Sequence, residues 1–305
     1  MKTIHLGVPL VAALVLAACG SDDNNTSNTT SNLTIPFQAK AAGVDIACGV
    51  ALSSLGTTAD QGTIADFAFY VHDIKFKTST GATVSATLEK NDFQDPQYGV
   101  ALLDFQNKGD SCNGTAKPTN KVVYAKIEGI DPATISGMEF KVGVPAAANH
   151  HNANTSIAPY NRSGMFWNWQ YGHKFMRLDV NPANKVQLAY DSNGSSVANT
   201  YFFHLGSTGC QGDPVTGAVV SCSEANRTTI TLSQSFKVVN LTTSKVVLDY
   251  AKLMQGVNLN TDAAAPAGCM SGLTDVECPT IFNNLGMAYG TIPATAAQSV
   301  FSVAN

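Results

Sequence analysis

Residues 66–76 read DFAFYVHDIKF, and this stretch decides the fold. Phe67, Phe69 and Val71 occupy every second position, which is the side-chain period of a β-strand. The apolar positions then shift phase to Ile74, and a shift of this kind predicts a β-bulge directly before that residue. The stretch therefore predicts a bulged β-strand.

The same strand signals recur along most of the chain, separated by turn-forming clusters such as the one at 191–194. Loop-like composition interrupts them at 145–164 and at 262–293, where a short helix is expected around 280–285. Short strands with polar turns are typical of a β-sandwich or a barrel. We therefore expect an all-β fold, a single β-sandwich-like domain with long loops. Further strands are predicted at 121–127, 138–144, 174–180, 186–190, 200–205, 228–239 and 245–250.

The composition fits an exported β-protein. Of the 305 residues, 44% are hydrophobic and only 13% are charged, which is about half of the usual charged share of roughly 25%. Helical bundles and coiled coils need far more Glu, Lys, Arg and Leu, and the apolar content excludes full disorder. Acidic residues outnumber basic ones by 22 to 18, so no nucleic-acid partner is expected.

The amino terminus has the features of an export signal. Lys2 is followed by an apolar run over 8–18, which is too short to span a bilayer, and then by Cys19. Leu-Ala-Ala-Cys at 16–19 resembles a bacterial lipobox, whereas the alternative is a chance cysteine after an ordinary signal peptide. We expect residues 1–18 to be a lipoprotein signal peptide and Cys19 to carry the lipid that attaches the protein to a membrane.

After Cys19 the chain is rich in Ser, Thr, Asn and Asp and has no hydrophobic periodicity, so residues 19–33 are expected to form a flexible tether. The folded domain is then expected over 34–305. The lipid would hold this domain in the cell envelope, facing the periplasm. Gly20 follows Cys19 where some sorting signals of lipoproteins carry Asp. By resemblance to those signals, Gly instead of Asp at this position permits delivery to the outer membrane.

Six cysteines remain once Cys19 is set aside, and an even number in an exported chain argues for three disulfides that staple the domain. A thiolate metal cluster is the alternative, but the sequence has no C-x-x-C and an oxidising compartment disfavours free thiolates. Sequence alone leaves many pairings open. Proximity favours Cys210 with Cys222 and Cys269 with Cys278, which leaves Cys48 with Cys112.

Histidine and tryptophan gather between residues 150 and 204. Imidazole suits copper or zinc, and a His-His pair on a loop near another histidine favours a metal site. Trp167 and Trp169 would share one face of a strand, where they are also interpreted as core or groove-lining aromatics. Lone histidines in strands, such as His72 and His173, are usually structural. The candidate metal ligands are His150, His204, His151, His173 and His72.

The sequence lacks the motifs of common enzymes. It has no G-x-S-x-G nucleophile elbow, no phosphate-binding loop, no dinucleotide fingerprint and no H-E-x-x-H zinc motif. A hydrolytic or oxidative enzyme with a histidine-bound metal would need a base or an open-site motif, and neither is identifiable. We therefore expect a protein that is not an enzyme.

Three strings of the sequence resemble one family of exported bacterial proteins. They are GMFWNWQYGHKF at 164–175, FHLGSTGC at 203–210 and GCMSG at 268–272. The strings are long and unusual, and the resemblance covers nearly the whole mature chain. It is to the MbnP-like family, the four-cysteine partner proteins of the metallo-mystery pair systems.

The resemblance implies a copper site that is completed by a second protein. In that family a di-haem enzyme similar to MauG and to cytochrome c peroxidases, called MbnH, oxidises a tryptophan of its partner to kynurenine, and copper binding depends on that product. Here the oxidised residue would be Trp167 or Trp169, and the first copper ligands would be His150 and His204. The family commonly has Tyr where His173 stands, so an additional ligand at that position would be a departure.

A second interpretation of the same features needs no metal. Short strands, low charge and exposed aromatic residues are also typical of a periplasmic or surface β-sandwich module that binds a sugar, a peptide or a protein. Trp167 and Trp169 would then be stacking platforms for the ligand. Ligand binding that is lost in the Trp167→Ala variant, in the absence of metal, would favour this interpretation.

Overall fold

The computed structural model of the protein describes most of the chain beyond residue 28. The predicted signal peptide at 1–18, Cys19, the turn cluster at 191–194 and the end of the predicted strand at 228–239 lie outside the described residues. In the described part, no helix has both the length and the apolar character needed to cross a membrane. The described ranges are 29–189, 196–213, 215–216, 218–232, 244–263 and 266–304.

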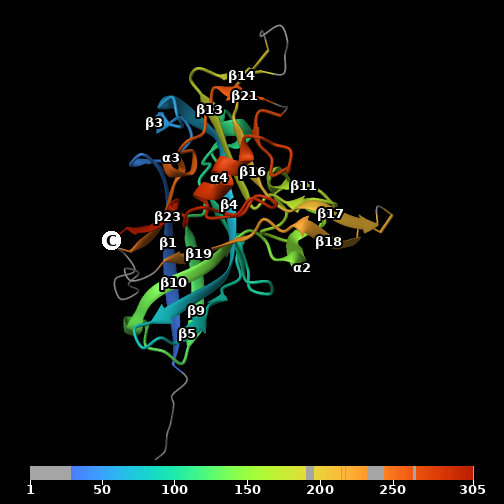
Figure 1. Ribbon diagram of the computed structural model, residues 1–305. Helices are drawn as coiled ribbons and strands as arrows, with labels where there is room; N and C mark the ends of the chain where they lie inside the picture. The colour runs from blue at the N-terminus through green and yellow to red at the C-terminus, as the bar shows by residue number, and fades with distance from the viewer. Residues whose placement is uncertain are drawn as a thin grey trace, which may run out of the picture.

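The strand predicted from residues 66–76 lies at the centre of the larger sheet (Figure 1). This sheet has the order β19 (Thr228–Leu232), β10 (Ile135–Val142), β4 (Asp60–Thr78), β13 (Met176–Pro182), β16 (Phe202–Leu205) and β22 (Gly268–Cys269), with β3 (Leu52–Leu55), β5 (Thr83–Ser85) and β8 (Val100–Asp104) paired to β4 and β7 (Gln94–Asp95) to β8. Asp73 has a φ of 52° and the register between β4 and β10 shifts beside it. The bulge predicted before Ile74 is therefore confirmed.

The second sheet covers one face of the first. Its strands are β23 (Phe301–Ala304), β20 (Lys245–Asp249), β1 (Thr30–Ala41), β9 (Val122–Glu128) and β6 (Thr87–Leu88), with β2 (Val44–Asp45) paired to β1. β1 begins at Thr30, so the expected boundary at residue 34 is wrong by four residues. Residues 30–33 are polar enough to resemble a tether, but their backbone pairs with β9, with Thr30 opposite Glu128.

Aromatic side chains from both sheets meet in the core. Phe37 of β1 packs edge-on against Phe69 of β4 and Phe140 of β10, with ring centroids 6.3 and 5.8 Å apart. Phe301 of β23 packs against the same two rings at 5.9 and 5.4 Å. All four side chains are buried. Two sheets that share one interior in this way form a β-sandwich, which confirms the predicted all-β fold.

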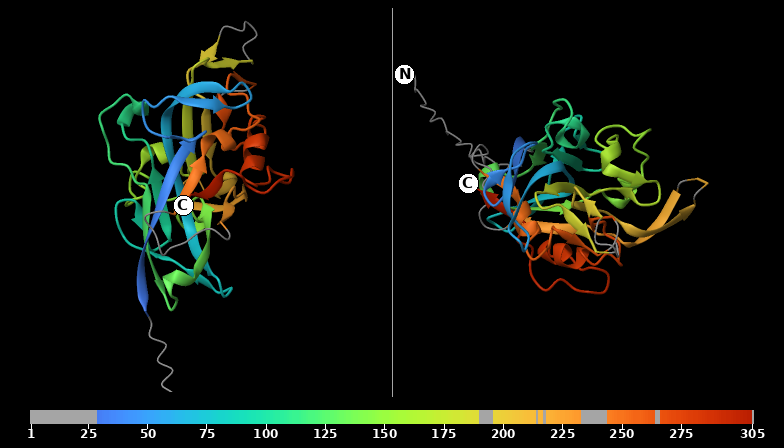
Figure 2. Two further views of the ribbon diagram at one scale, coloured as in Figure 1. Left: turned by 90° about the vertical axis from the view of Figure 1, so that its left-hand side faces the viewer. Right: turned by 90° about the horizontal axis from the view of Figure 1, so that it is seen from above.

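Shorter elements surround the sandwich. The β17–β18 hairpin extends away from the body of the molecule (Figure 2). Each predicted strand overlaps an observed one, and the helix expected around 280–285 is α4. The shorter strands are β11 (Phe166–Asn168), β12 (Gly172–His173), β14 (Val186–Leu188), β15 (Val197–Ala198), β17 (Thr208–Asp213), β18 (Ala218–Glu224) and β21 (Thr261–Asp262). The α-helical segments are α1 (Gly109–Cys112), α2 (Ala146–Asn149), α3 (Tyr250–Leu253) and α4 (Cys278–Asn284), and 3-10 turns lie at Pro132–Thr134 and Ser163–Met165.

Three disulfides staple these elements together, as predicted. One joins β17 to β18, one joins β22 to α4, and one joins the segment after β2 to α1. No cysteine among the described residues is left as a free thiol. The pairs are Cys210 with Cys222, Cys269 with Cys278 and Cys48 with Cys112, which are the pairs that proximity favours.

Candidate metal centre

The two tryptophans lie in different surroundings. Trp167 is the middle residue of β11, whereas Trp169 lies in the turn after that strand, so the expectation that both share one strand face is wrong. The strand ends because the Asn168 side-chain oxygen accepts the backbone N–H groups of Gln170 and Tyr171. This turn directs the two indole rings to different neighbours.

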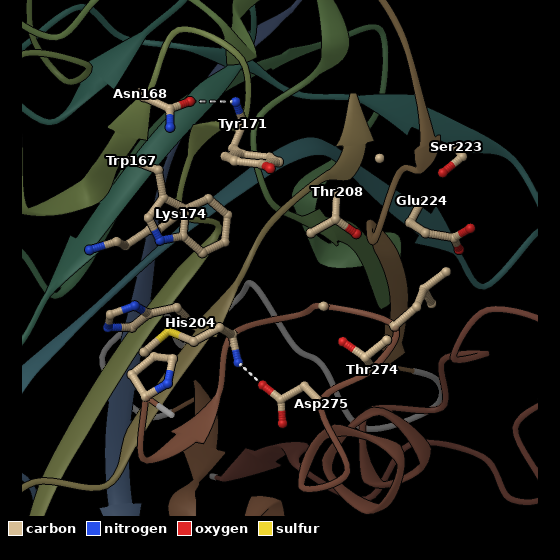
Figure 3. A pocket seen from close by; sticks show the side chains of 15 residues that line it. Trp167, Asn168, Tyr171, Lys174, His204, Thr208, Ser223, Glu224, Thr274 and Asp275 are labelled. Carbon is tan, nitrogen blue, oxygen red and sulfur yellow. Dashed lines mark hydrogen bonds between the residues drawn. The ribbon is translucent and has the colours of Figure 1, made fainter. Parts of the chain in front are cut away.

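Trp167 lines an open cavity of about 870 Å³, which we call the Trp167 pocket (Figure 3). Its indole ring lies 6.3 Å from the imidazole of His204 and 6.4 Å from the ring of Tyr171, centroid to centroid. The ring also lies so close to Gly206 that a Cβ at this position would overlap it. The pocket is lined by Trp167, Asn168, Tyr171, Lys174, His204, Thr208, Gly209, Ser223, Glu224, Pro266, Met270, Gly272, Leu273, Thr274 and Asp275.

One ring nitrogen of His204 makes a hydrogen bond, and the other makes none with the described residues. Its Nε2 donates to Asp179 Oδ1 at 2.9 Å, which fixes the tautomer and leaves the lone pair on Nδ1. Nδ1 is buried and has no hydrogen-bond partner among the described residues. Burial lowers the pKa of His204 more than its hydrogen bond to the Asp179 carboxylate raises it, so the ring stays neutral near pH 7. A histidine held by a carboxylate with its other nitrogen free is typical of a metal ligand.

Asp179 is itself held in place by an ion-pair network. Its Oδ2 accepts a hydrogen bond from Arg177 Nε at 2.8 Å, and Arg177 Nη1 pairs with Asp66 Oδ2 at 2.9 Å. Asp179 is fully buried, so its charge needs the hydrogen bonds from Arg177 and His204. The network therefore fixes the orientation of the His204 ring.

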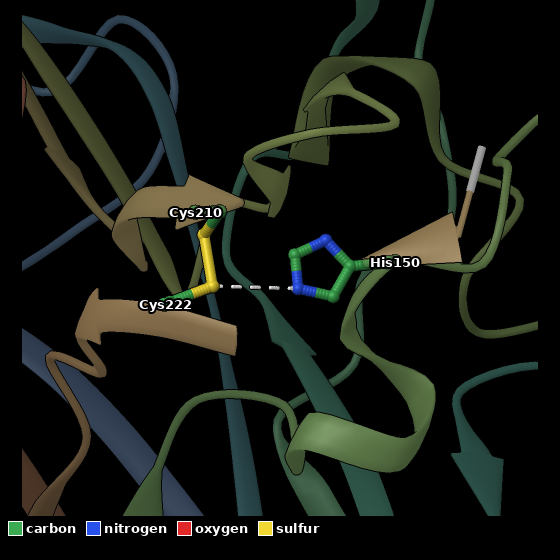
Figure 4. Close-up of side chains that lie close together, drawn as sticks. All are labelled: His150, Cys210 and Cys222. Atoms are coloured by element: carbon green, nitrogen blue, oxygen red, sulfur yellow. Dashed lines mark hydrogen bonds between the residues drawn. A yellow bond between two sulfur atoms is a disulfide. The ribbon is translucent and has the colours of Figure 1, made fainter. Parts of the chain in front are cut away.

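A second group, which we call the His150 cluster, contains His150, Trp169 and the disulfide of Cys210 and Cys222. Figure 4 shows His150 and the two cysteines. His150 Nδ1 donates to the backbone oxygen of Trp169 at 3.1 Å, and Nε2 lies 3.2 Å from the Asn149 amide nitrogen and 3.7 Å from Cys222 Sγ. Cys222 is bonded to Cys210, so neither sulfur is a thiolate. Both ring nitrogens of His150 therefore have polar neighbours already, and the disulfide sulfurs do not form a metal site with this histidine.

His173 lies in a separate cluster of aromatic side chains. Its ring stacks on Tyr160 with centroids 5.5 Å apart and an interplanar angle of 11°. Both ring nitrogens are buried without a hydrogen-bond partner among the described residues. Burial lowers the pKa of His173 to about 3, so the ring is neutral. His151 packs edge-on against Tyr98 and Tyr160, at 5.5 and 6.1 Å.

His72 lies at the bulge of β4. Its Nδ1 donates to the backbone oxygen of Gly143 at 2.8 Å, and burial lowers its pKa to about 4. The structural interpretation made for lone strand histidines therefore fits His72. It does not fit His173 in full, because the stacked aromatic rings offer its nitrogens no acceptor or donor.

The structure thus separates the predicted ligands into groups. It brings His204 to Trp167 and His150 to Trp169, and it does not bring the five histidines to one centre. Sequence reasoning missed Asp179 and Met270. In the strand predicted at 174–180, Asp179 follows Arg177 by two positions on the same strand face, which was a signal for Asp179, and the GCMSG string contained Met270.

Comparison with known proteins agrees with this architecture. The model of the MbnP family matches residues 30–271. Among solved structures, MbnP from Methylosinus trichosporium superposes with a TM-score of 0.76 at 28% sequence identity, covering 90% of this chain and 99% of that chain. No curated protein matches the chain. The family match covers well over half of the sequence, and the chain therefore belongs to the MbnP family.

Proposed function

We propose that this protein is an exported copper carrier whose metal site is completed when a partner di-haem enzyme of the MauG and MbnH type oxidises Trp167 to kynurenine. Membership of the MbnP family supports a copper-related, accessory and non-catalytic role. The observation that carries the proposal is the buried, unpartnered Nδ1 of His204, a residue that lines the same pocket as Trp167.

The donor set of the Trp167 pocket fits copper only after oxidation. An indole N–H is a donor and has no lone pair for a metal. Kynurenine carries an aryl amine and a ketone, and both have lone pairs. Together with the imidazole of His204 they supply nitrogen and oxygen donors suited to copper. The carboxylate of Asp179 increases the basicity of that imidazole.

The oxidation must break the C2–C3 bond of the indole ring and add one oxygen atom to each of these carbons. Hydrolysis then releases C2 as formate and leaves the aryl amine. The oxidising equivalents and oxygen atoms come from the partner's peroxide-type chemistry. Trp167 is half-buried beside the open pocket, and the exposed ring of Tyr171 lies next to it. Both features favour access from a docked partner.

The proposed lipid on Cys19 would leave the pocket free. The Thr30 end of β1 lies at the bottom of Figure 1, whereas β11 and β16 lie on the opposite part of the molecule. A chain anchored through its amino terminus to the outer membrane would therefore present the Trp167 pocket away from the attachment point, toward the periplasm.

Co-expression with the di-haem partner tests the proposal. Trypsin cuts after Arg162 and Lys174, so both tryptophans fall in the peptide 163–174. We expect this peptide to carry the mass gain of the tryptophan-to-kynurenine conversion, and the protein to bind copper. Co-expression with a partner that lacks a haem ligand is the control. An unchanged peptide mass together with no bound copper after co-expression with the active partner would overturn the proposal.

The volume of the Trp167 pocket favours one second candidate. A cavity of about 870 Å³ bordered by Trp167 and Tyr171 is large enough for a small organic ligand, so a metal-free binding module is the alternative. Sugar or peptide binding by protein made without the partner, lost in the Trp167→Ala variant, would support this candidate.

A further inference from the structure

Met270 is the neighbour of His204 on the adjacent strand. β22 runs parallel to β16, with Cys269 opposite Phe203, so one further step places Met270 opposite His204. The two segments stay in contact past the end of the strand, because Ser271 Oγ donates to the backbone oxygen of His204 at 2.8 Å. Opposite residues of a parallel pair project on the same side of the sheet. Met270 and His204 accordingly both line the Trp167 pocket.

The backbone of Met270 is held firmly. Its N–H donates to Asp275 Oδ2 at 2.7 Å, and the preceding Cys269 is bonded to Cys278 at the start of α4. A donor on such a restrained segment loses little conformational freedom when it binds a ligand. The disulfide therefore contributes to the pocket by fixing the segment that carries the thioether.

Two charged groups of the pocket already have hydrogen-bond partners. The two oxygens of Asp275 accept the N–H groups of Met270 and Glu277, and Lys174 Nζ donates to the backbone oxygen of Gly164 at 3.0 Å. Among the described residues the thioether of Met270 makes no hydrogen bond. It is a soft donor in the pocket that His204 also lines, and soft thioether donors favour Cu(I).

We propose that Met270 Sδ is a copper ligand that acts with His204 Nδ1 and the kynurenine at position 167, and that it makes the site selective for Cu(I). This inference rests on the proposed function. It adds a sulfur donor from GCMSG to the nitrogen and oxygen donors, and it assigns the site a preferred oxidation state.

The test uses mature protein from co-expression with the di-haem partner, loaded with Cu(I). We expect Met270→Leu, which conserves volume, to lower the Cu(I) affinity at least about tenfold in competition with a chromophoric chelator. X-ray absorption should show sulfur scattering around copper in the wild type and none in Met270→Leu. Every described cysteine is in a disulfide, so a thioether is the expected source of this signal. Met287→Leu, a buried methionine outside the pocket, is the matched control.

The outcomes separate this inference from the proposed function. Copper binding without a sulfur signal, and with equal affinity in wild type and Met270→Leu, would overturn the role of Met270 and leave the kynurenine site intact. Absence of both the peptide mass gain and copper in the wild type would overturn both. An equal loss of affinity in Met270→Leu and Met287→Leu would show a general packing effect and count against Met270 as a ligand.

Discussion

The Trp167 pocket and the His150 cluster contain the same pair of residue types in different states. In the pocket, which His204 lines, Nε2 of this residue is held by Asp179 and Nδ1 has no hydrogen-bond partner among the described residues. In the cluster, the nitrogens of His150 face a backbone oxygen, an amide and a disulfide sulfur. Proximity of tryptophan and histidine is therefore not enough for a metal site. The histidine also needs a ring nitrogen whose lone pair makes no hydrogen bond, and the site needs space for an ion.

Replacing each tryptophan in turn is the strongest test of the difference between the Trp167 pocket and the His150 cluster. We expect Trp167→Phe to abolish formation of kynurenine and Trp169→Phe to retain it, because only Trp167 lines the open pocket. Fragment-ion masses of the peptide 163–174 after co-expression identify the modified position. Conversion at position 169 with position 167 unchanged would reverse the assignment of the two regions.

The next largest effect is expected on copper affinity when the histidines are changed. His204→Gln keeps an amide that can donate to Asp179 but removes the ring lone pair, and we expect the Cu(I) affinity to fall by about 100-fold or more. His150→Gln serves as the matched variant and should cost less than about tenfold, since its nitrogens are engaged. Chelator competition measures both. A larger loss in His150→Gln would show that the cluster rearranges to supply a ligand.

A smaller effect is expected when only the support of His204 is changed. Asp179→Asn weakens the hydrogen bond that fixes the ring, and loss of such a partner typically costs roughly 10- to 100-fold in metal affinity. Asp66→Asn is the control, because Asp66 pairs with the same Arg177 without touching the histidine. Thermal unfolding of both variants shows whether the network still folds. Equal copper affinities in the two variants would mean that Asp179 acts only on stability.

The fold was largely predictable because its signals are local. The two-residue period and the phase shift before Ile74 identified β4 and its bulge, and proximity favoured the observed disulfides. The start of β1 was missed because Thr, Ser and Asn also compose tethers, and only pairing with β9 distinguishes the two. β8 was missed because all five of its residues are buried, so it has no alternation to detect.

The candidate site was predictable only in part. Its residue types gathered in the sequence, but their grouping depends on where the chain turns. The turn at Asn168 separates Trp169 from Trp167, and the parallel register of β16 and β22 brings Met270 to His204 across about 65 residues of sequence. Contacts that depend on long-range register leave no local pattern.

The smallest expected effect concerns the histidines that lie outside the Trp167 pocket. Burial lowers the pKa of His72 from 6.5 to about 4 and that of His173 to about 3. The unfolded chain therefore binds protons below pH 6.5 while the folded protein does not, so stability is present above this pH and falls as the pH decreases toward 4. Each group should cost about 1 kcal/mol of unfolding free energy between pH 6.5 and about pH 5.5.

Denaturant unfolding of metal-free protein at these two pH values measures the loss. His72→Asn retains an amide donor for the Gly143 oxygen and removes the titrating ring, so its stability should fall about 1 kcal/mol less than that of the wild type. His173→Phe keeps the stack on Tyr160 and should give a similar reduction. Neither substitution should alter copper binding, because both rings lie outside the Trp167 pocket. A loss of copper in His173→Phe would instead mean that its unpartnered nitrogens serve the metal, and the two regions would then be parts of one site.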